Sequence, residues 1–259
     1  MDFKLALVTG ASAGLGKALC QRLAERKISL ILIARDEKRL KELASSLPVQ
    51  TEICCADLSL ANDREKLIQL IHDKKPDLVI NNAGFGRYGP VLAHPLSAND
   101  EMIEVNIRAL TDLSIESARA LKKADKRGTV VNISSAAAFF SYPTFCIYAA
   151  TKAYVNRFSE ALDLELKPHG IRVLTVCPGQ ISTSFRLRAS GNFPQKEDKI
   201  SMTAEHAAEL IIRQIQRGKS LAIIDWRTRI LVTISRLLPA KLLQSLLMRS
   251  LKKRHVFSD

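Results

Sequence analysis

KLALVTGASAGLG, the sequence of residues 4–16, is an apolar run that passes directly into a glycine-rich turn. The run at residues 4–9 predicts a strand, and an amphipathic pattern typical of a helix begins at Gly16. Gly10, Gly14 and Gly16 allow a tight turn and let the backbone approach a pyrophosphate, an anion that a helix N-terminus also attracts. The spacing Gly-x-x-x-Gly-x-Gly therefore predicts a phosphate-binding loop, and a glycine turn that only links a strand to a helix is the alternative.

Strand-like and helix-like segments alternate along the rest of the chain. The expected strands are Lys4–Thr9, Ser29–Ala34, Val49–Cys54, Leu78–Asn81, Gly128–Ser134 and Arg172–Cys177, with a further candidate at Ser220–Ile224. The expected helices are Gly16–Arg26, Glu37–Leu47, Arg64–His72, Asn99–Leu121, Tyr148–Leu166 and Ala204–Arg217. Because parallel strands need crossover connections, this alternation predicts an α/β fold with a doubly wound parallel sheet and helices on both faces. No repeat or flexible linker divides the chain, so we expect a single domain with a C-terminal helical extension.

The composition is that of a globular protein, with 47% hydrophobic and 25% charged residues among 259. The five cysteines include no CxxC pair and are an odd number, which indicates reduced thiols. We therefore expect neither a disulfide framework nor a metal site. The sequence opens without the pattern of an export signal, and no stretch reaches the roughly 18–20 apolar residues that span a bilayer. These features predict a cytoplasmic protein.

Tyr148 and Lys152 form the pattern Tyr-x-x-x-Lys in a segment with helical periodicity. Residues four apart share a helix face, so the ammonium should lie beside the phenol and lower its pKa from about 10 toward the range of a general acid. Ser135 follows an expected strand, at the sheet edge where the catalytic groups of open α/β sheets collect. A Tyr–Lys pair alone is most often a solvated helix face. Its combination with Ser135 and the glycine loop is what indicates a site.

Across residues 3–183 the chain resembles the short-chain dehydrogenase/reductase family. The resemblance rests on these motifs, which occur in the family order: Thr9-Gly10-x-x-x-Gly14-x-Gly16, Asn81-Asn82-Ala83-Gly84, Asn106, Ser134-Ser135, Tyr148-x-x-x-Lys152 and Pro178-Gly179. The interval from Ser135 to Tyr148 also matches the family and selects Ser135 over Ser134. The resemblance implies a Rossmann-like NAD(P)-binding catalytic domain over residues 1–229.

The resemblance also implies catalytic roles at the matching positions. Tyr148 would pass a proton to a carbonyl oxygen while hydride arrives from the nicotinamide, and Ser135 would hydrogen-bond that oxygen. Lys152 would bind the nicotinamide ribose and depress the pKa of Tyr148. Asn106 would hold a water of a proton relay from Lys152, and a core or helix-capping amide is the alternative for this residue alone.

The choice of cofactor depends on the end of the second expected strand. There an acidic residue favours the NAD ribose diol, and an arginine accommodates the NADP 2′-phosphate. Ala34 stands in place of the acid and Arg35 follows, so we expect NADP(H); Asp36 would favour NAD(H) if the strand ended one residue later. Lys38 and Arg39 are expected to face solvent. The implied cofactor contacts are Gly10, Ser12, Ala13, Gly14, Leu15, Gly16, Arg35, Asp57, Leu58, Asn82, Ala83, Gly84, Tyr148, Lys152, Pro178, Gly179, Ile181 and Thr183.

Substrate choice in the family lies largely after Pro178-Gly179. Residues 180–201 are polar and lack a clear period, so they predict a mobile lid over the substrate. An apolar pocket is expected from the aromatic residues Phe139, Phe140, Tyr142, Phe145 and Phe193, with ordinary core packing as the alternative. A Leu-Leu-Pro sequence before a basic helix is similar to relatives that act on acyl or sterol ketones. We therefore expect a lipophilic carbonyl substrate, 3-oxoacyl or sterol-like.

Residues 230–259 form a basic C-terminal extension. Residues 213–254 contain eleven Lys or Arg and a single acid, Asp225, so they carry about ten of the thirteen net positive charges. Apolar residues recur at helical spacing on both sides of Pro239 and predict two amphipathic helices. Such helices either pack on the protein or on another subunit, which we slightly favour, or lie through residues 230–254 on the inner membrane surface. No recognition motif accompanies the charge, so nucleic acid is not an expected partner.

The expected function is NADP(H)-dependent interconversion of a ketone or aldehyde and an alcohol, with Tyr148 as proton donor or acceptor. The alternative is a cofactor-binding regulator without catalysis. Family members of that kind usually lose the Tyr or the Lys, and this chain retains both. The resemblance also implies a homodimer or homotetramer.

Overall fold

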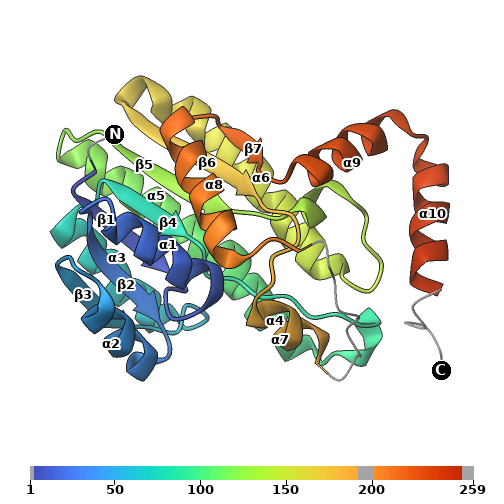
Figure 1. The fold of residues 1–259 in the computed structure, drawn as a ribbon, viewed down its shortest axis with the longest axis horizontal. Coiled ribbons are helices and arrows are strands. Elements are labelled where there is room, and N and C mark those ends of the chain that lie inside the picture. The colour runs from blue at the N-terminus through green and yellow to red at the C-terminus, as the bar shows by residue number, and fades with distance from the viewer. Residues whose placement is uncertain (1–2, 192–200, 253–259) are drawn as a thin grey trace.

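The computed structural model describes residues 3–191 and 201–252. Its strands form one parallel sheet in the order β3-β2-β1-β4-β5-β6-β7 (Figure 1). They are β1 (Leu5–Thr9), β2 (Ser29–Ala34), β3 (Thr51–Cys55), β4 (Leu78–Asn81), β5 (Gly128–Ile133), β6 (Ile171–Cys177) and β7 (Leu221–Ile223). The strand order reverses between β1 and β4. An open parallel sheet has its ligand crevice at such a switch point, beyond the carboxyl ends of the strands.

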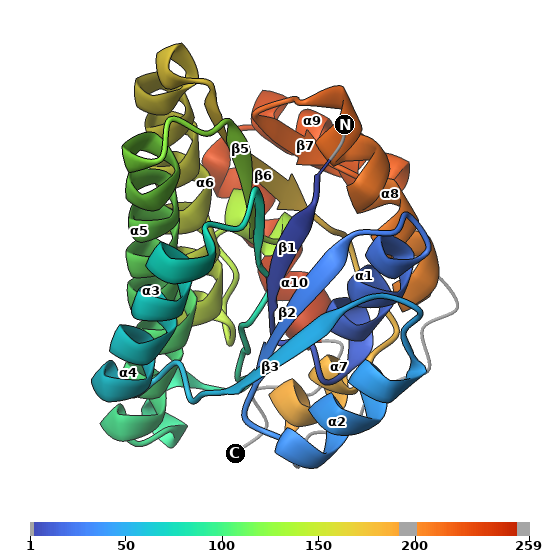
Figure 2. The same cartoon turned by 90° about the vertical axis from the view of Figure 1, so that its left-hand side faces the viewer.

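Helices cover both faces of the sheet, as the doubly wound prediction requires (Figure 2). One face carries α1 (Gly14–Ala24), α2 (Glu37–Ser46) and α8 (Ala204–Arg217), and the other carries α3 (Ala61–Lys74), α5 (Leu110–Lys123) and α6 (Cys146–Leu166). Successive side chains of a strand point to opposite faces. Along β1, Ala6 and Val8 belong to the core under α1 and α8, whereas Leu7 belongs to the core under α3 and α5. The sheet is therefore buried on both sides.

The predicted strands are confirmed to within two residues at each end. One predicted helix that is important for the site differs from the structure. The sequence predicts one helix over residues 99–121, but the structure has three segments there: α4 (Leu96–Ile103), the π-helix η2 (Glu104–Ala109) and α5. The single-helix prediction is wrong because a continuous amphipathic pattern does not reveal an insertion of i→i+5 hydrogen bonds. Asn106 lies in this π-helix.

The segment after β6 contains more regular structure than its sequence indicates. Residues 184–190 form α7 (Ser184–Ser190), and Ile181 and Met202 form an isolated parallel bridge. The absence of a helical period was therefore misleading for α7, whose N-terminus is capped by the Thr183 hydroxyl. Residues 192–200 of the predicted lid, with Phe193, lie outside the described residues, and lid motion stays a prediction.

Two helices follow β7. They are α9 (Trp226–Leu237), which begins four residues before the predicted extension, and α10 (Ala240–Lys252), which lies apart from the sheet at one end of the molecule (Figure 1). Residues 253–259 of the extension are outside the described part of the chain. Among the described residues, no helix is both long and apolar enough to cross a membrane. All five cysteines are free thiols, as expected.

A buried carboxylate fixes α6, the helix of Tyr148 and Lys152, to the sheet. Asp163 is 1% exposed and accepts hydrogen bonds from Arg172 Nε at 2.8 Å, from the Val173 N–H at 2.8 Å and from Ser220 Oγ at 2.6 Å. Burial by itself raises the pKa of Asp163, but the hydrogen bonds from Arg172, Ser220 and Val173 outweigh it and hold this pKa below its ordinary value. The carboxylate thus ties α6 to β6 and to the residue that precedes β7.

We expect Asp163→Asn to lower the free energy of unfolding by about 2–3 kcal/mol at pH 7, because charged hydrogen bonds are lost from a buried site. The folded-state pKa is depressed, so this stabilisation is present above the ordinary carboxyl pKa and is lost as pH falls through the folded value. Urea unfolding from pH 7 to pH 3 should show the difference from wild type shrinking below about pH 4. Glu165→Gln, at an exposed position of the same helix, is the control. An unchanged midpoint for Asp163→Asn would contradict the assignment.

Candidate active site

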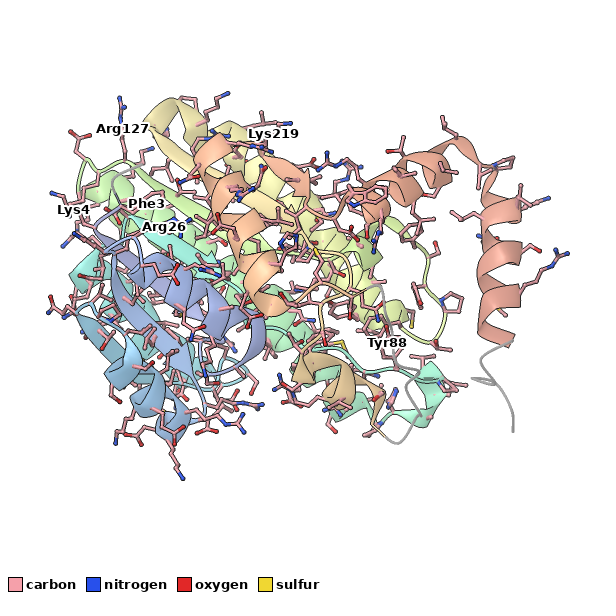
Figure 3. The ribbon with its side chains drawn as sticks, viewed as in Figure 1. Phe3, Lys4, Arg26, Tyr88, Arg127 and Lys219 are labelled. Carbon is pink, nitrogen blue, oxygen red and sulfur yellow. The ribbon has the colours of Figure 1, made fainter. Side chains whose placement is uncertain are left out.

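The switch point opens into a large cavity at the carboxyl ends of the strands. Its volume is about 1580 Å³, larger than a typical single small-ligand site. The lining residues follow β1, β2, β3, β4, β5 and β6, so one continuous space joins the glycine loop to Tyr148. Tyr88, another lining residue, lies well away from Phe3 and Lys4, which precede β1, on the side of the molecule toward α10 (Figure 3).

The glycine loop has the geometry of an anion cradle. Gly10 and Gly14 have φ of +67° and +51°, the left-handed region that side chains rarely adopt. A Cβ on Gly16 would lie 2.1 Å from the Gly10 carbonyl oxygen, so only glycine fits there. Ala13 occupies the N-cap of α1 and provides no capping side chain. The first N–H groups of α1 are therefore left for a ligand, and a pyrophosphate fits this loop.

Thr9 and Asn82 join the loop to the end of β4. Thr9 Oγ1 accepts hydrogen bonds from the N–H groups of Asn82 at 3.0 Å and Ala83 at 2.9 Å. Asn82 Nδ2 in turn donates to the Thr9 carbonyl oxygen at 2.9 Å. These reciprocal bonds fix the two strand ends between which the nucleotide would lie.

The structure shows that Arg35, and not Asp36, is the first residue after β2. The strand ends at Ala34 as predicted, and Asp36 is the N-cap of α2, where its carboxylate accepts from the Arg39 N–H at 3.0 Å. Arg35 is 61% exposed at its side chain and lies 3.4 Å from Asp57 and 3.6 Å from Glu101. Arg39 is exposed, as predicted, with 61% of its side chain accessible, and it also lines the cavity. Two guanidinium groups thus border this end of the cavity.

Aromatic rings surround Tyr148 at the other end of the cavity. Its ring stacks on Phe145 at a centroid distance of 4.3 Å, Phe145 stacks on Tyr88 at 3.9 Å, and Phe185 of α7 lies 5.7 Å from Tyr148. Gly86 makes this arrangement possible, because a Cβ there would lie 2.6 Å from the Phe145 ring. The reacting end of the cavity is therefore largely apolar.

The Tyr148 hydroxyl is held in its protonated form. Burial raises the pKa of Tyr148 above its ordinary value, and a hydrogen bond with Ser135 offsets part of this rise. This direction is the opposite of the sequence prediction, in which Lys152 lowers the pKa. The ring is 7% exposed, so desolvation sets the direction of the pKa shift, and Lys152 Nζ lies 5.7 Å from the ring centroid. A protonated phenol beside Ser135 is suited to donate a proton.

Lys152 is buried on the same helix face, at 4% exposure. Its Nζ donates to the Ile133 carbonyl oxygen at 2.9 Å. Burial lowers the pKa of Lys152 to about 8. The amine therefore exchanges its proton near neutral pH, whereas an exposed lysine would stay charged.

Asn106 lies behind the cavity wall and does not line it. Its side chain accepts from the Phe85 N–H at 3.1 Å and donates to the Phe85 carbonyl oxygen at 2.9 Å and to Thr151 Oγ1 at 3.2 Å. A Cβ on Gly84 would lie 3.0 Å from Asn106 Oδ1 and 3.3 Å from Lys152 Nζ. The amide thus fixes the loop beside Lys152, as the core-amide alternative predicts, and the relay stays a prediction.

The structure brings the predicted residues together except for Asn106 and Phe139, and Phe193 lies outside the described residues. Ser135 and all eighteen predicted cofactor contacts line the cavity, as do Phe140, Tyr142 and Phe145, whereas Phe139 does not. Sequence reasoning missed Tyr88, Phe185, Arg188, Thr228 and Leu231, which also line it. No motif marked these residues, which lie on α7, on α9 and, for Tyr88, in the loop after β4. Their contribution is to the wall on the Tyr148 side.

The sequence matches the family model described as short chain dehydrogenase over residues 4–191, well over half of the chain. The chain is a short-chain dehydrogenase/reductase. It is therefore an oxidoreductase that acts on alcohol and carbonyl groups.

Relatives of this dehydrogenase include enzymes with defined ligands. Sulfoacetaldehyde reductase 2 of Chromohalobacter salexigens is 33% identical over 220 residues, covering 80% of this chain and 86% of its own. A short-chain dehydrogenase from Sphingobium yanoikuyae in complex with NADPH is 30% identical, with a TM-score of 0.79 over 86% of this chain and 88% of its own. The bulky-bulky ketone specific alcohol dehydrogenase from Comamonas testosteroni is also 30% identical, with a TM-score of 0.76 over 86% of both chains.

The depressed pKa of Lys152 predicts a cost to stability. Below about pH 8 the folded protein must bury the ammonium, and this cost disappears as pH rises from the folded pKa toward the unfolded value of 10.5. We expect Lys152→Met to raise the free energy of unfolding at pH 7 by about 1–2 kcal/mol, after allowance for the lost hydrogen bond to Ile133. Denaturant unfolding at pH 7 and pH 10 measures the effect, which should fade at the higher pH. A loss of stability at pH 7 would contradict the prediction, and exposed Lys126→Met is the control.

Proposed function

We propose that this dehydrogenase reduces a lipophilic ketone or aldehyde to an alcohol with NADPH, and catalyses the reverse reaction with NADP. The observation that carries the proposal is the buried Tyr148 hydroxyl, protonated and hydrogen-bonded to Ser135 in a cavity continuous with the glycine loop. NAD(H) is the alternative cofactor, and a regulator without catalysis is the alternative function.

The residues of the site divide the reaction between them. A bound reduced nicotinamide would supply the hydride to the carbonyl carbon. Tyr148 donates its hydroxyl proton to the carbonyl oxygen, so that the alcohol forms, and Ser135 hydrogen-bonds the same oxygen and orients it. Lys152, with a pKa of about 8, then returns a proton toward Tyr148 and regains one from solvent. Thr9, Asn82 and the glycine loop hold the nucleotide end.

Arg35 supports NADP(H) over NAD(H). Its guanidinium borders the cavity next to Arg39, and the nearby acid Asp36 is engaged in capping α2. A ribose 2′-phosphate would therefore meet two positive groups, whereas a ribose diol would lack the acid that usually binds it. The NADPH complex of the Sphingobium relative is consistent with this assignment.

The walls around Tyr148 support a lipophilic substrate of the 3-oxoacyl or sterol-like kind. Phe140, Tyr142, Phe145, Phe185 and Leu231 line this end of the cavity. Burial of apolar surface against such walls stabilises a bulky hydrocarbon substrate. The Comamonas relative is specific for bulky ketones. The homodimer or homotetramer that the family implies also remains a proposal, which light scattering would test.

Tyr148→Phe tests the mechanism because it removes the proton donor and keeps the stacked ring. We expect kcat to fall about 10²–10⁴-fold, the usual contribution of general acid catalysis, with little change in the Kd for NADPH. NADPH oxidation across ketosteroids, 3-oxoacyl thioesters, small diketones and aldehydes gives kcat, and fluorescence titration gives Kd. Tyr154→Phe, outside the cavity, is the matched control. Wild-type protein that binds NADPH but turns over none of these carbonyls would favour the regulator.

Arg35→Gln tests the cofactor. Loss of one charged hydrogen bond to the 2′-phosphate should weaken NADPH binding about 10–100-fold, whereas NADH binding should change little. Calorimetric titration of both cofactors against wild type, Arg35→Gln and the exposed control Arg157→Gln provides the comparison. Equal weakening of NADPH and NADH, or tighter binding of NADH by wild type, would refute the NADP(H) assignment.

A further inference from the structure

Helix α9 has one buried side and, opposite it, an exposed apolar side. Val232 and Ser235 point inward and are 2% and 8% exposed. The opposite side carries the α9 stripe, which we define as Trp226, Ile230, Ile234 and Leu237, with exposures of 63%, 50%, 49% and 81%. These positions are spaced four, four and three residues apart and therefore share one helix face. Core packing accounts for the inward side and leaves the α9 stripe unexplained.

Helix α9 also borders the active-site cavity, through residues beside the α9 stripe. Leu231, which follows Ile230 in the helix, is 57% exposed and lines the cavity. Thr228 of the same helix also lines it. Arg188 of α7 lines the same cavity. A molecule that moves from an apolar surface in contact with the α9 stripe into the cavity would therefore pass beside Leu231.

Basic side chains accompany the α9 stripe on α9 and on α10. The guanidinium of Arg227 lies 5.5 Å from the centroid of the Trp226 ring, and Lys241 and Arg249 are exposed on α10. Asp225, the single acid among residues 213–254, caps α9 by accepting from the Arg227 N–H at 3.2 Å and the Thr228 hydroxyl at 2.6 Å. The local charge is therefore strongly positive and little of it is neutralised.

Apolar and basic side chains continue along α10. Leu242 and Met248 are 48% and 37% exposed, and α10 lies apart from the sheet (Figure 1). The sequence alone slightly favours packing of these helices on the protein or on another subunit. Packing on a second copy of this chain would bring two strongly basic surfaces together, which like-charge repulsion opposes. A surface that is both apolar and negatively charged complements α9 and α10 instead.

We propose that α9 and α10 dock on the surface of a bilayer that contains anionic lipids, with the α9 stripe at the level of the acyl chains and the basic residues at the headgroups. The cavity mouth beside Leu231 then faces the membrane, and the carbonyl substrate enters from the lipid phase. The docking surface stands on its own observations, whereas the entry of substrate rests on the proposed function.

Vesicle sedimentation tests the docking without cofactor or turnover. We expect the full-length protein to bind phosphatidylcholine vesicles with about 30% phosphatidylserine, and to bind pure phosphatidylcholine at least tenfold more weakly. Binding to the anionic vesicles should weaken as NaCl rises from about 0.05 M to about 0.5 M. Equal binding to both vesicles, or binding to neither, would overturn the proposal.

Matched variants locate the contact on α9 and α10. The double variant Ile230→Asn and Ile234→Asn should weaken binding about tenfold or more, whereas Leu60→Asn and Leu164→Asn, also exposed, should not. The triple variant Arg227→Gln, Lys241→Gln and Arg249→Gln should weaken it about fivefold per charge removed, whereas Lys123→Gln, Lys126→Gln and Lys167→Gln should have a small effect. Retained thermal unfolding midpoints would show that each variant is folded. Equal effects of test and control variants would overturn the proposal.

Two further measurements separate this proposal from its competitors. Light scattering that finds a dimer lost in the Ile230/Ile234 variant, together with no vesicle binding, would assign the α9 stripe to a second copy and overturn membrane docking.

The Ile230/Ile234 variant should reduce a water-soluble ketone at the wild-type rate but a bilayer-partitioned ketone several-fold more slowly. Vesicle binding without any carbonyl reduction would sink the proposed function and leave docking intact. Reduction of both ketones without vesicle binding would overturn the docking and leave the proposed function intact.

Discussion

The close contact of three backbone segments at the switch point is the constraint on which the site depends. Gly16 of α1 lies so near the Gly10 carbonyl that no side chain fits between them, and a Cβ at Gly16 would also lie 2.7 Å from Asn82 Nδ2. Asn82 in turn holds the end of β1 through Thr9. Because α1, β1 and β4 meet this closely, the first N–H groups of α1 point into the crevice rather than into the core. The nucleotide end of the cavity follows from this packing.

The reacting end depends on a different property, the burial of two titratable groups on one helix face. Burial disfavours the charged form of each group, so it raises the pKa of Tyr148 and lowers that of Lys152. The phenol is consequently kept protonated, and the amine exchanges its proton near pH 8. Burying these two groups costs free energy. The charged hydrogen bonds of Asp163, farther along the same helix, hold α6 on β6 and offset this cost. Anchor and site are thus parts of one element.

The sequence predicted the sheet well and the environment of the site less well. The limits of β2 and β4 match the prediction because buried parallel strands are unbroken apolar runs between polar turns. The glycine loop, Ser135, Tyr148 and Lys152 were identifiable because their chemistry requires fixed residue types at fixed spacing. The direction of the Tyr148 pKa shift was not, because it depends on burial, to which Phe185 of the distant helix α7 contributes. Gly86 carried no local signal either, since the Phe145 ring that excludes a side chain there is 59 positions away.

Arg64 shows how the two ends of the cavity are connected through such an unpredicted contact. Its buried guanidinium donates to the carbonyl oxygen of Leu58, one of the predicted cofactor contacts, at 2.9 Å, and pairs with Glu104 at 3.0 Å. Glu104 begins the π-helix that carries Asn106, and Asn106 holds Phe85 beside Lys152. A buried charge with partners on both sides resists displacement of either one. The loop at Leu58 and the segment beside Lys152 are therefore each held by polar contacts from the π-helix, through Glu104 on one side and Asn106 on the other.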